Sequence, residues 1–534
     1  MWRSSTPFAP AAGDGRARAD GQAFVPSVAQ LLGEGGDHRI RPDEIAGLNA
    51  YGCAPEPDPD LAAFGSSTAS TISGAGWDAA VRLRARLADH LELAPPAAVY
   101  ERELGRVRGE LLRLCGLDGM RGLEVLFAPS GTDIHMLAAQ LIGGDPAAPA
   151  LAIIGEAEET GSGVPAALEG RSYSSSTPLA GPCDPDAPIG GVPATQVVHV
   201  PARRADGGLR DRTQVETEIE ALAAGATQQG RRVLLVVTDV SKTGLISPSP
   251  TFARDLQGRY PGRIEVLVDG CQFRLSGQTL RTYAGLGWMI AVTGSKFLTG
   301  PAFSGAVFVP PAMAERLGAR ILPQRLRAYC ARAEWPEGWA MRAGLEPVAN
   351  HGLLVRWEAA LEELRRFRAL SDEAICGFLT RFRTVAERAM ASSPLLEPAA
   401  GRPLDRDLGG TPGWDAAPTI FPFLLRRPGV CAGLLTAEET RRVYGLLRRD
   451  LGGRVAPAAP EAAAAKLRIE VGQPVACGAR DGAPATALRL CASARLIAEA
   501  CSGGPTVEQD ILERARLALE KAAWLAGEVA EARL

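Results

Sequence analysis

The segment Val266-Leu267-Val268-Asp269-Gly270-Cys271-Gln272 is an apolar run that ends in an acid, and 27 residues after this acid comes the lysine of Thr293-Gly294-Ser295-Lys296. Lys296 is one of only four lysines in the chain, against 54 arginines. Arginine cannot form a Schiff base, because its guanidinium stays protonated. An amine that must lose its proton and attack a carbonyl has to come from lysine. This strand-end lysine is therefore the first candidate for a catalytic residue.

The acid and the lysine together predict a cofactor, pyridoxal 5'-phosphate. Lys296 lies among small and apolar residues, and desolvation by such surroundings prepares a lysine amine as a nucleophile. Asp269 is expected to keep the cofactor's ring nitrogen protonated, so that the ring withdraws electrons from the substrate. Gln272 is a candidate donor to the ring hydroxyl. The alternatives are a turn-capping role for Asp269 and a solvated loop position for Lys296.

A third segment, Ser130-Gly131-Thr132, follows an apolar run and begins a helical pattern. Free N–H groups and the positive dipole end make such a helix start a phosphate site. The alternative is a simple N-cap, for which serine is a usual residue. The order of this loop, then Asp269, then Lys296 favours the phosphate site. Further candidates for phosphate contacts are the hydroxyls of Thr293, Ser295 and Thr299.

Composition argues against several other classes of function. The net charge of −3 gives no electrostatic basis for binding nucleic acid or an anionic membrane. No apolar run reaches membrane-spanning length, and residues 1–21 lack the apolar core of a signal peptide, so we expect a soluble, cytoplasmic protein. The ten cysteines form no C-x-x-C pair and the five histidines are dispersed, so no metal site is expected.

Seven short apolar runs predict the sheet of a large domain: 123–128, 150–154, 196–200, 233–240, 264–268, 288–293 and 306–309. Strands of this kind alternating with helices are typical of a mostly parallel sheet buried on both faces. The short connection between the last two runs predicts one antiparallel neighbour. Helices mixed with a few separated strands then predict a smaller α+β domain.

The expected organisation has three parts. They are an N-terminal arm and substrate loop over 1–75, a large cofactor-binding domain over 76–345, and a small C-terminal α+β domain over 346–534. Residues 1 to about 40 are polar and rich in glycine and alanine, which predicts a loosely held arm.

The order Ser130-Gly131-Thr132, Asp269-x-x-Gln272, Ser295-Lys296 resembles the fold-type I pyridoxal-phosphate-dependent enzymes. Within these it is most similar to the class V aminotransferase and cysteine desulfurase group, over residues 45–495. The resemblance implies a Schiff base at Lys296, ring contacts from Asp269 and Gln272, and phosphate contacts from Gly131, Thr132 and Ser295.

The outer parts of the resemblance concern the substrate. Residues 49–57 resemble the group's N-terminal substrate loop, which makes Asn49 a candidate substrate contact. Residues 472–490 resemble the stretch that ends in the substrate-carboxylate arginine, which implies this role for Arg489 and a contact from Gln473. An arginine fork suits a carboxylate. The alternative for Arg489 is a surface charge.

The chain departs from the group's pattern around the ring. The group places an aromatic residue over the ring from the segment after the second strand, but residues 155–163 contain none. Glu159 or Thr160 falls near that place, and His135 is an outside candidate. Either another region of the chain supplies an aromatic residue over the ring, or no aromatic residue stacks on it. Lys242 stands where the group has asparagine near the ring hydroxyl. Its possible roles are a proton shuttle, an anion-binding group or an exposed side chain.

These features predict an enzyme that acts on an amino acid through a Schiff base, as an aminotransferase or as a lyase at Cα or Cβ. One alternative is sulfur transfer of the cysteine desulfurase type, but Val471 stands where the nucleophilic cysteine would be, and Cys477 is the only nearby substitute. The other is a binding protein that keeps the fold without turnover. The resemblance also implies a homodimer, with 344–347 similar to the loop that reaches the partner's phosphate site and Leu345 in place of a frequent threonine.

Overall fold

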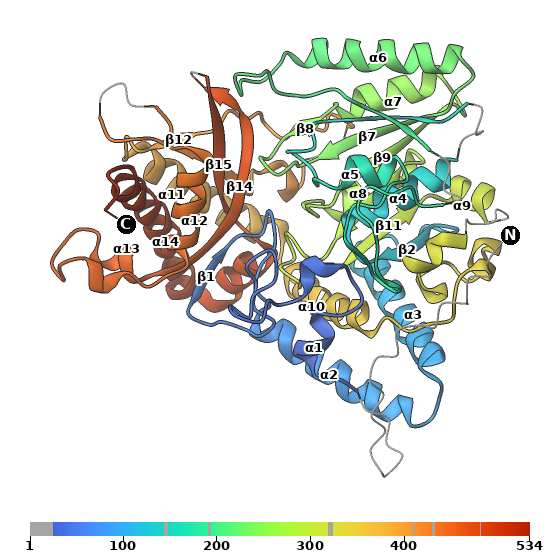
Figure 1. Cartoon of the computed structure of the whole chain (residues 1–534), viewed down its shortest axis with the longest axis horizontal. Coiled ribbons are helices and arrows are strands. Elements are labelled where there is room, and N and C mark those ends of the chain that lie inside the picture. The colour runs from blue at the N-terminus through green and yellow to red at the C-terminus, as the bar shows by residue number, and fades with distance from the viewer. Residues whose placement is uncertain are drawn as a thin grey trace, which may run out of the picture.

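The computed structural model describes residues 25–143, 148–190, 194–318, 324–409, 412–429, 433–480 and 482–533. Two large sheets organise these residues, one on each side of the long helix α10 (Figure 1). Most of the predicted N-terminal arm, residues 1–24, lies outside the described residues.

The larger sheet has the predicted architecture. Its strand order is β2-β11-β10-β9-β7-β3-β6, and the two-residue strand β8 pairs with β7. All neighbours are parallel except at β11, which is antiparallel to β10 and β2, and at β8. The strands are β2 (Glu124–Ala128), β3 (Leu151–Ile154), β6 (Gln196–His199), β7 (Val233–Asp239), β8 (Ile246–Ser247), β9 (Ile264–Gly270), β10 (Met289–Thr293) and β11 (Gly305–Val309). The seven predicted runs and the antiparallel last pair are confirmed.

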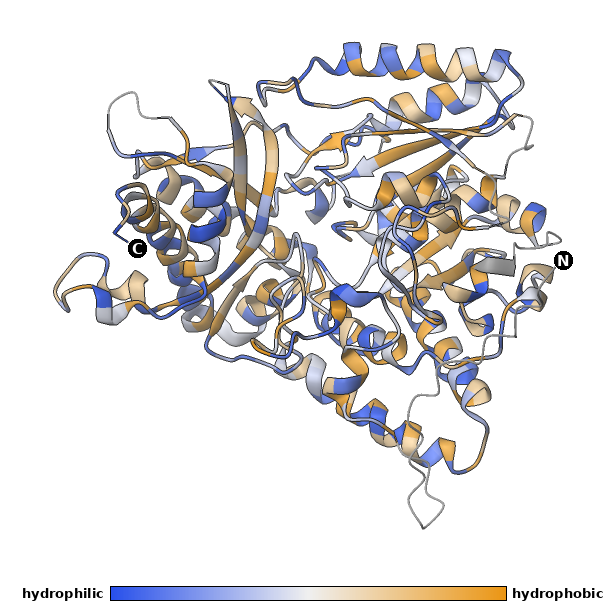
Figure 2. Cartoon of the chain, in the orientation of Figure 1, coloured by the Kyte–Doolittle hydropathy of each residue, from blue (hydrophilic) through white to orange (hydrophobic). Residues whose placement is uncertain are grey.

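Helices cover both faces of this sheet. Strand residues alternate between two cores: Val266 and Val268 belong to one, whereas Leu267 between them belongs to the other. Figure 2 shows these strands mainly in the hydrophobic colours, as expected for strands buried on both faces. The helices of this part are α2 (Gly74–Leu91), α3 (Pro96–Leu114), α4 (Gly131–Ile142), α5 (Val164–Leu168), α6 (Arg212–Gln228), α7 (Pro250–Arg259), α8 (Gly277–Gly285) and α9 (Pro311–Leu317).

The smaller sheet has the order β1-β14-β15-β13-β12. Its strands are β1 (Leu61–Phe64), β12 (Leu396–Pro398), β13 (Ile420–Leu425), β14 (Arg468–Arg480) and β15 (Ala483–Cys491). The helices around it are α10 (His351–Arg368), α11 (Asp372–Ala391), α12 (Ala437–Leu447), α13 (Ala462–Lys466) and α14 (Ala494–Ala530). A short hairpin, β4 (Ser176–Thr177) and β5 (Gly181–Pro182), stands apart from both sheets.

The N-terminal segment differs from the expected loose arm. Helix α1 (Val28–Leu32) is buried through Val28, Leu31 and Leu32, and the buried Arg356 of α10 donates to the carbonyls of Glu34 and Gly35. Strand β1, in a segment that the sequence analysis treats as loop, pairs in parallel with β14. The N-terminal segment thus completes the smaller sheet.

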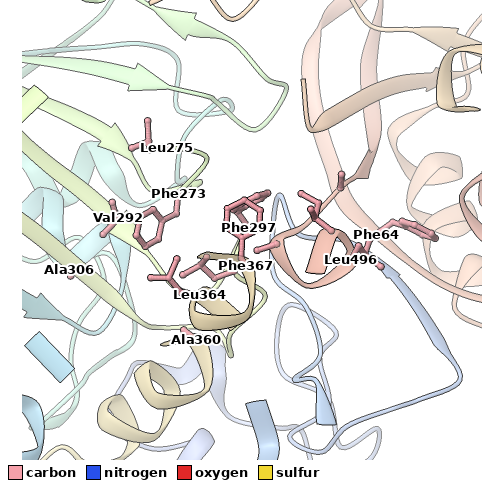
Figure 3. Close-up of a cluster of buried hydrophobic side chains, with 14 of the residues drawn as sticks. Phe64, Phe273, Leu275, Val292, Phe297, Ala306, Ala360, Leu364, Phe367 and Leu496 are labelled. Atoms are coloured by element: carbon pink, nitrogen blue, oxygen red, sulfur yellow. The ribbon is translucent and has the colours of Figure 1, made fainter. Parts of the chain in front are cut away.

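A cluster of buried hydrophobic side chains brings Phe273 and Val292, which precede Lys296, together with Phe297 and Phe367, which follow it (Figure 3). The ring of Phe297 stacks on Trp414 at 5.2 Å and meets Phe367 of α10 edge-on at 5.2 Å. Phe297 is 1 % exposed, so the residue after Lys296 is fixed in the core while Lys296 itself faces a cavity. Among the described residues, no helix combines the length and the apolarity needed to cross a bilayer.

Candidate active site

A cavity of about 220 Å³ opens at the carboxyl ends of the large sheet's strands. Open α/β sheets bind ligands at this edge. The register places Asp269 of β9 beside Ala291 of β10, the strand that leads to Lys296. Thirteen residues singled out from the sequence as site candidates line this one cavity: Ser130, Gly131, Thr132, His135, Glu159, Thr160, Lys242, Asp269, Gln272, Thr293, Ser295, Lys296 and Gln473.

Asp269 forms an ion pair with His135 inside this cavity. Nε2 of His135 lies 3.5 Å from Oδ2 of Asp269, and Nδ1 is 2.7 Å from the carbonyl oxygen of Gly131. Burial raises the pKa of Asp269, but the attraction of His135 and of Lys296 outweighs it and holds this pKa well below its usual range. Burial lowers the pKa of His135, and the charge of Asp269 reverses this and raises it. The pair is therefore ionised. The carboxylate of Asp269 is held in place where it could pair with a cationic ring nitrogen.

The loop that carries Lys296 is fitted tightly against α10. A Cβ on Gly294 would lie 2.5 Å from the Cβ of Ala360, and one on Gly300 would lie 2.6 Å from the same atom. Only glycine at both positions lets the loop approach the helix this closely. Thr299, between them, has φ of +56°, a conformation that is costly for a residue with a branched side chain.

Strained backbone recurs around the cavity. Val240, Phe273, Thr299 and Phe303 all have positive φ, between 56° and 73°. Val240 and Phe303 line the cavity, and Phe273 directly follows Gln272, which does too. Such conformations gather at functional sites, where the surrounding structure fixes them.

The start of α4 forms the phosphate-sized end of the cavity. Ser130 is indeed an N-cap: its hydroxyl accepts from the N–H of Asp133 at 3.2 Å, and the Asp133 carboxylate accepts from the N–H of Ser130 at 2.9 Å. The N–H groups of Gly131 and Thr132 have no acceptor within the helix. A Cβ on Gly131 would lie 2.9 Å from Sγ of Cys271, so glycine is needed for this close approach to β9. Capping and anion binding are therefore compatible here.

Thr299 does not line this cavity; its hydroxyl donates to the neighbouring carbonyl of Leu298 at 2.7 Å. The hydroxyl of Thr293 lines the cavity and donates to the carbonyl of Cys271 at 2.7 Å. Ser295 is therefore the candidate hydroxyl from this loop that keeps its donor for a phosphate.

Glu159, near the expected place of a ring-stacking residue, is bound to the protein itself. Its carboxylate accepts from Nε of Arg203 at 2.8 Å, from the hydroxyl of Ser241 at 2.7 Å and from the hydroxyl of Thr243 at 2.6 Å. Burial raises the pKa of Glu159, but Arg203 and these donors outweigh burial and lower it. This ionised carboxylate joins the segment after β3 to the turn after β7.

Lys242 in that turn extends into the cavity. Its backbone N–H donates to the carbonyl of Glu159 at 2.9 Å. Within the described ranges, no carboxylate lies within ion-pair distance of the Lys242 amine. Burial, followed by the charges of Lys296 and Arg489, lowers the pKa of Lys242 to about 8. The three cations therefore lie close together with no acid paired to Lys242.

Arg489 of β15 lies behind the hydroxyl-rich loop after β1. Its Nε donates to Ser67 at 3.1 Å and its Nη2 donates to Thr68 at 2.7 Å, and both hydroxyl residues line the cavity. Arg489 is 1 % exposed, and Nη1 has no partner. A buried arginine held by hydroxyls rather than carboxylates is suited to a ligand carboxylate, and the surface-charge alternative does not hold.

The predicted substrate loop contributes differently from expectation. Asn49 does not line the cavity; its Oδ1 accepts from the N–H groups of Tyr51 and Cys53 and closes a turn. Tyr51 does line it, with Arg39 and Phe303. Tyr51 and Phe303 pack with ring centroids 6.4 Å apart, and Arg39 lies over Phe303 at 5.1 Å. These three residues are absent from the sequence prediction, and only Tyr51 lay in a segment that it singled out.

The residues present fit pyridoxal phosphate. Lys296 offers an amine for the aldehyde, Asp269 an ionised acid for the ring nitrogen, and α4 free N–H groups for the phosphate. Gln272 donates one N–H to the carbonyl of Ser67 at 3.0 Å, which leaves its second for another acceptor. Besides Nε2 of His135, whose contact with Asp269 is an ion pair only, three buried polar atoms in or beside the cavity have no hydrogen-bond partner: Oγ1 of Thr160, Oγ1 of Thr238 and Nη1 of Arg489. Such atoms are rare in folded proteins and indicate a polar ligand.

Comparison with known proteins found no protein-family model and no curated sequence that matches the chain. Solved structures match over most of it. The cystine C–S lyase C-DES in complex with cysteine persulfide has a TM-score of 0.50 at 15 % identity, covering 86 % of this chain and 98 % of that one. A C-DES variant with glycine covalently linked to the PLP cofactor has a TM-score of 0.52 at 15 % identity, covering 86 % of this chain and 99 % of that one. A NifS-like protein from Rickettsia africae ESF-5 has a TM-score of 0.50 at 11 % identity, covering 86 % of this chain and 98 % of that one.

These matches show the fold. It is that of the fold-type I pyridoxal-phosphate enzymes with a large and a small part, so the predicted fold class is confirmed. At 11–15 % identity they show nothing finer than the fold.

Proposed function

We propose that this chain is a pyridoxal-phosphate-dependent enzyme that acts on an amino acid. The observation that carries the proposal is the meeting of three groups in one cavity: the amine of Lys296, the ionised Asp269–His135 pair and the N-terminus of α4. A binding protein without turnover needs no amine at this place. The fold shared with enzymes described as PLP-bound supports the same conclusion.

Each group has a distinct role in this proposal. Lys296 holds the cofactor's aldehyde and then carries the proton at Cα of the substrate. Asp269 keeps the ring nitrogen protonated, and His135 keeps Asp269 ionised. The N–H groups of Gly131 and Thr132 with the hydroxyl of Ser295 hold the phosphate. When bound, the cofactor supplies an electron sink for the bond that breaks at Cα.

Arg489 holds the substrate's α-carboxylate through its unpartnered Nη1. Ser67 and Thr68 fix the guanidinium from the other side. With the substrate's α-carboxylate held by Arg489 and the cofactor held at Lys296, the protein would determine which bond at Cα is oriented for cleavage. The reaction is of the aminotransferase type or that of a lyase at Cα or Cβ.

The sulfur-transfer alternative has little support among the described cysteines. Cys477 is 4 % exposed, does not line the cavity, and burial raises the pKa of its thiol to about 11. Cys271 lines the cavity, but burial and then Asp269 raise the pKa of its thiol well above the usual value. A persulfide-forming cysteine needs a thiolate. Cys431 lies outside the described residues.

The test is reduction of the purified protein with borohydride after loading with pyridoxal phosphate. We expect a visible absorbance band before reduction and, after it, the cofactor on the Lys296 peptide alone. Attachment to Lys242 with Lys296 unmodified contradicts the proposal. A screen of amino acids, scoring keto acid, pyruvate, sulfide and CO₂ together, then separates transferase, lyase and desulfurase chemistry. Turnover after Cys477→Ala argues further against sulfur transfer.

We further propose a cytoplasmic homodimer with the active site near the subunit interface. The support is the similarity of 344–347 to a partner-reaching loop, although Leu345 is 2 % exposed and packs in the core of the large sheet. Light scattering of the cofactor-loaded protein at micromolar concentration tests the dimer. A monomer with full cofactor occupancy contradicts it.

A further inference from the structure

The cavity and the Arg489 guanidinium behind its wall together hold more positive charge than the proposed reaction requires. Its acids are already neutralised: Asp269 pairs with His135, and Glu159 pairs with Arg203. Arg39 is also paired, because its guanidinium binds the carboxylate of Asp37 through Nε at 2.9 Å and Nη2 at 2.6 Å. Lys242, Lys296 and Arg489 remain without a carboxylate among the described residues.

Two of these three cations have an assigned anion or aldehyde. Lys296 binds the aldehyde, and Arg489 binds the α-carboxylate. Lys242 is left over, although it lies close enough to both for their charges to act on its amine. A half-buried cation beside two others is costly unless a ligand compensates it.

No described carboxylate lies within ion-pair distance of the Lys242 amine, although the charges of Glu159 and Glu158 act on it from farther away. Glu159 lies next to it, with its carbonyl 2.9 Å from the N–H of Lys242. The carboxylate of Glu159, however, faces Arg203, Ser241 and Thr243, which occupy both of its oxygens. The amine of Lys242 therefore faces the cavity alone.

A second donor lies on the same wall. Thr160 directly follows Glu159, lines the cavity and is 7 % exposed, and its Oγ1 has no partner. A buried hydroxyl without a partner loses free energy unless a ligand binds it. Lys242 and Thr160 together offer a charge and a hydroxyl to one anionic group.

The cofactor's phosphate is not that group. Its proposed site is the start of α4, where Gly131 packs on Cys271 after β9 and beside Thr293 of β10. Lys242 follows β7 on the other side of β9, next to the segment after β3. Lys242 thus approaches from the other side of Asp269, which marks the ring. Thr160 lies between the two sites, because a Cβ on the next residue, Gly161, would lie 3.6 Å from Oγ1 of Thr132.

We infer that Lys242, with Thr160, binds a second anionic group on the substrate, so that the substrate is an amino acid whose side chain ends in a carboxylate or another oxyanion. This inference rests on the proposed function, because Lys296 and Arg489 must serve the cofactor and the α-carboxylate. It names the substrate class of that site.

The experiment is a titration of the cofactor-loaded enzyme, followed by the change in its visible absorbance. The probes are L-aspartate, L-glutamate and L-cysteate, each with a sterically similar neutral partner: L-asparagine, L-glutamine and 3-sulfamoyl-L-alanine, the sulfonamide of L-cysteate. At least one acidic probe should bind at least about tenfold more tightly than its neutral partner. Lys242→Met should weaken that acidic probe on the order of 10- to 100-fold and change the neutral one little.

Two further variants complete the design. Lys242→Arg should keep the preference for the acidic probe, because it keeps the charge. Lys466→Met removes the same charge from an exposed lysine of α13 and should change nothing. Thermal unfolding of each variant checks that it is folded.

Equal binding of acidic and neutral probes by the unaltered enzyme overturns the inference, as does a preference that survives Lys242→Met. A loss that is the same for acidic and neutral probes also overturns it, because it places Lys242 on the cofactor's ring oxygen. Failure of the proposed function is a separate result: the unaltered protein then shows no visible band and no borohydride-stable attachment at Lys296.

Discussion

Nε2 of His135 lies 3.5 Å from Oδ2 of Asp269, while Nδ1 of the same ring lies 2.7 Å from the carbonyl oxygen of Gly131. One imidazole therefore connects the acid proposed for the ring nitrogen to the loop proposed for the phosphate. Protonated, the ring donates a hydrogen bond from Nδ1 to Gly131, and its charge attracts Asp269 at 3.5 Å. Because it is 1 % exposed, its proton is held by these two partners rather than by water.

Replacement of His135 should make the enzyme lose activity at low pH. In His135→Phe the buried Asp269 loses its main compensating charge, so burial raises its pKa. Activity should then fall reversibly as the pH is lowered through this raised pKa and recover at higher pH, a loss that the unaltered enzyme does not show. Asp269→Asn should lose at least about 100-fold in kcat at every pH, since it has no charge to recover. Unchanged pH–rate profiles for His135→Phe contradict the assigned role.

Lys296→Ala should abolish covalent attachment of the cofactor and lower turnover by several orders of magnitude, because the amine serves both as the aldehyde's partner and as the base. Lys296→Arg should be no better, since its guanidinium cannot lose a proton. Absorbance and mass spectrometry after borohydride reduction measure the attachment. Lys242→Met serves as the control and should retain it.

The sequence allowed the large sheet and the pair Asp269 and Lys296 to be predicted, because both depend on local patterns. An apolar run that ends in an acid or a lysine defines a strand end, and strand ends meet at one edge of a parallel sheet. The grouping of thirteen candidate residues around one cavity follows from that edge.

The rest depended on contacts between distant segments. The carboxylate of Glu159 is bound by Arg203 and Thr243, 44 and 84 residues away, so no local pattern showed that it is unavailable to the cofactor. Tyr51 and Phe303 meet across the chain, and β1 pairs with a strand of the far C-terminal part. The sequence marks Lys242 as unusual. Only the tertiary structure shows that it has no acid partner among the described residues.

Gly131→Ala should weaken cofactor binding by about tenfold or more while leaving the fold intact. The new Cβ would stand 2.9 Å from Sγ of Cys271 and push the start of α4 away from its position. Cys271→Ala removes the clashing sulfur, so the double variant should recover most of the cofactor affinity of Cys271→Ala alone. Equilibrium titration with pyridoxal phosphate measures this. A double variant as weak as Gly131→Ala shows that the contact is not the cause.

Lys521, unlike Lys242, uses its amine to hold the fold together. It is 0 % exposed, and its amine donates to the carbonyls of Leu447, Arg449 and Leu467, at the end of α12 and beside β14. Lys521→Met leaves these acceptors without a donor and should lower the free energy of unfolding by about 2 kcal/mol or more. Chemical denaturation measures it, with Lys466→Met as the matched control. Equal stability of the two variants means that the three hydrogen bonds contribute nothing net.

The preference for acidic substrates should disappear as the pH rises through about 8. Burial and then the charges of Lys296 and Arg489 lower the pKa of Lys242 to about 8, against the opposing charges of Glu159 and Glu158, so its amine loses its proton between pH 7 and pH 9. Only the protonated amine attracts an anion, and an occupied site holds the proton more firmly, so the affinity follows the pKa of the free enzyme. The ratio of the affinities for the preferred acidic probe and its neutral partner should therefore fall between pH 7 and pH 9. In Lys242→Arg the same ratio should stay constant over this range, because arginine remains charged. Parallel profiles for lysine and arginine would show that another group causes the pH dependence.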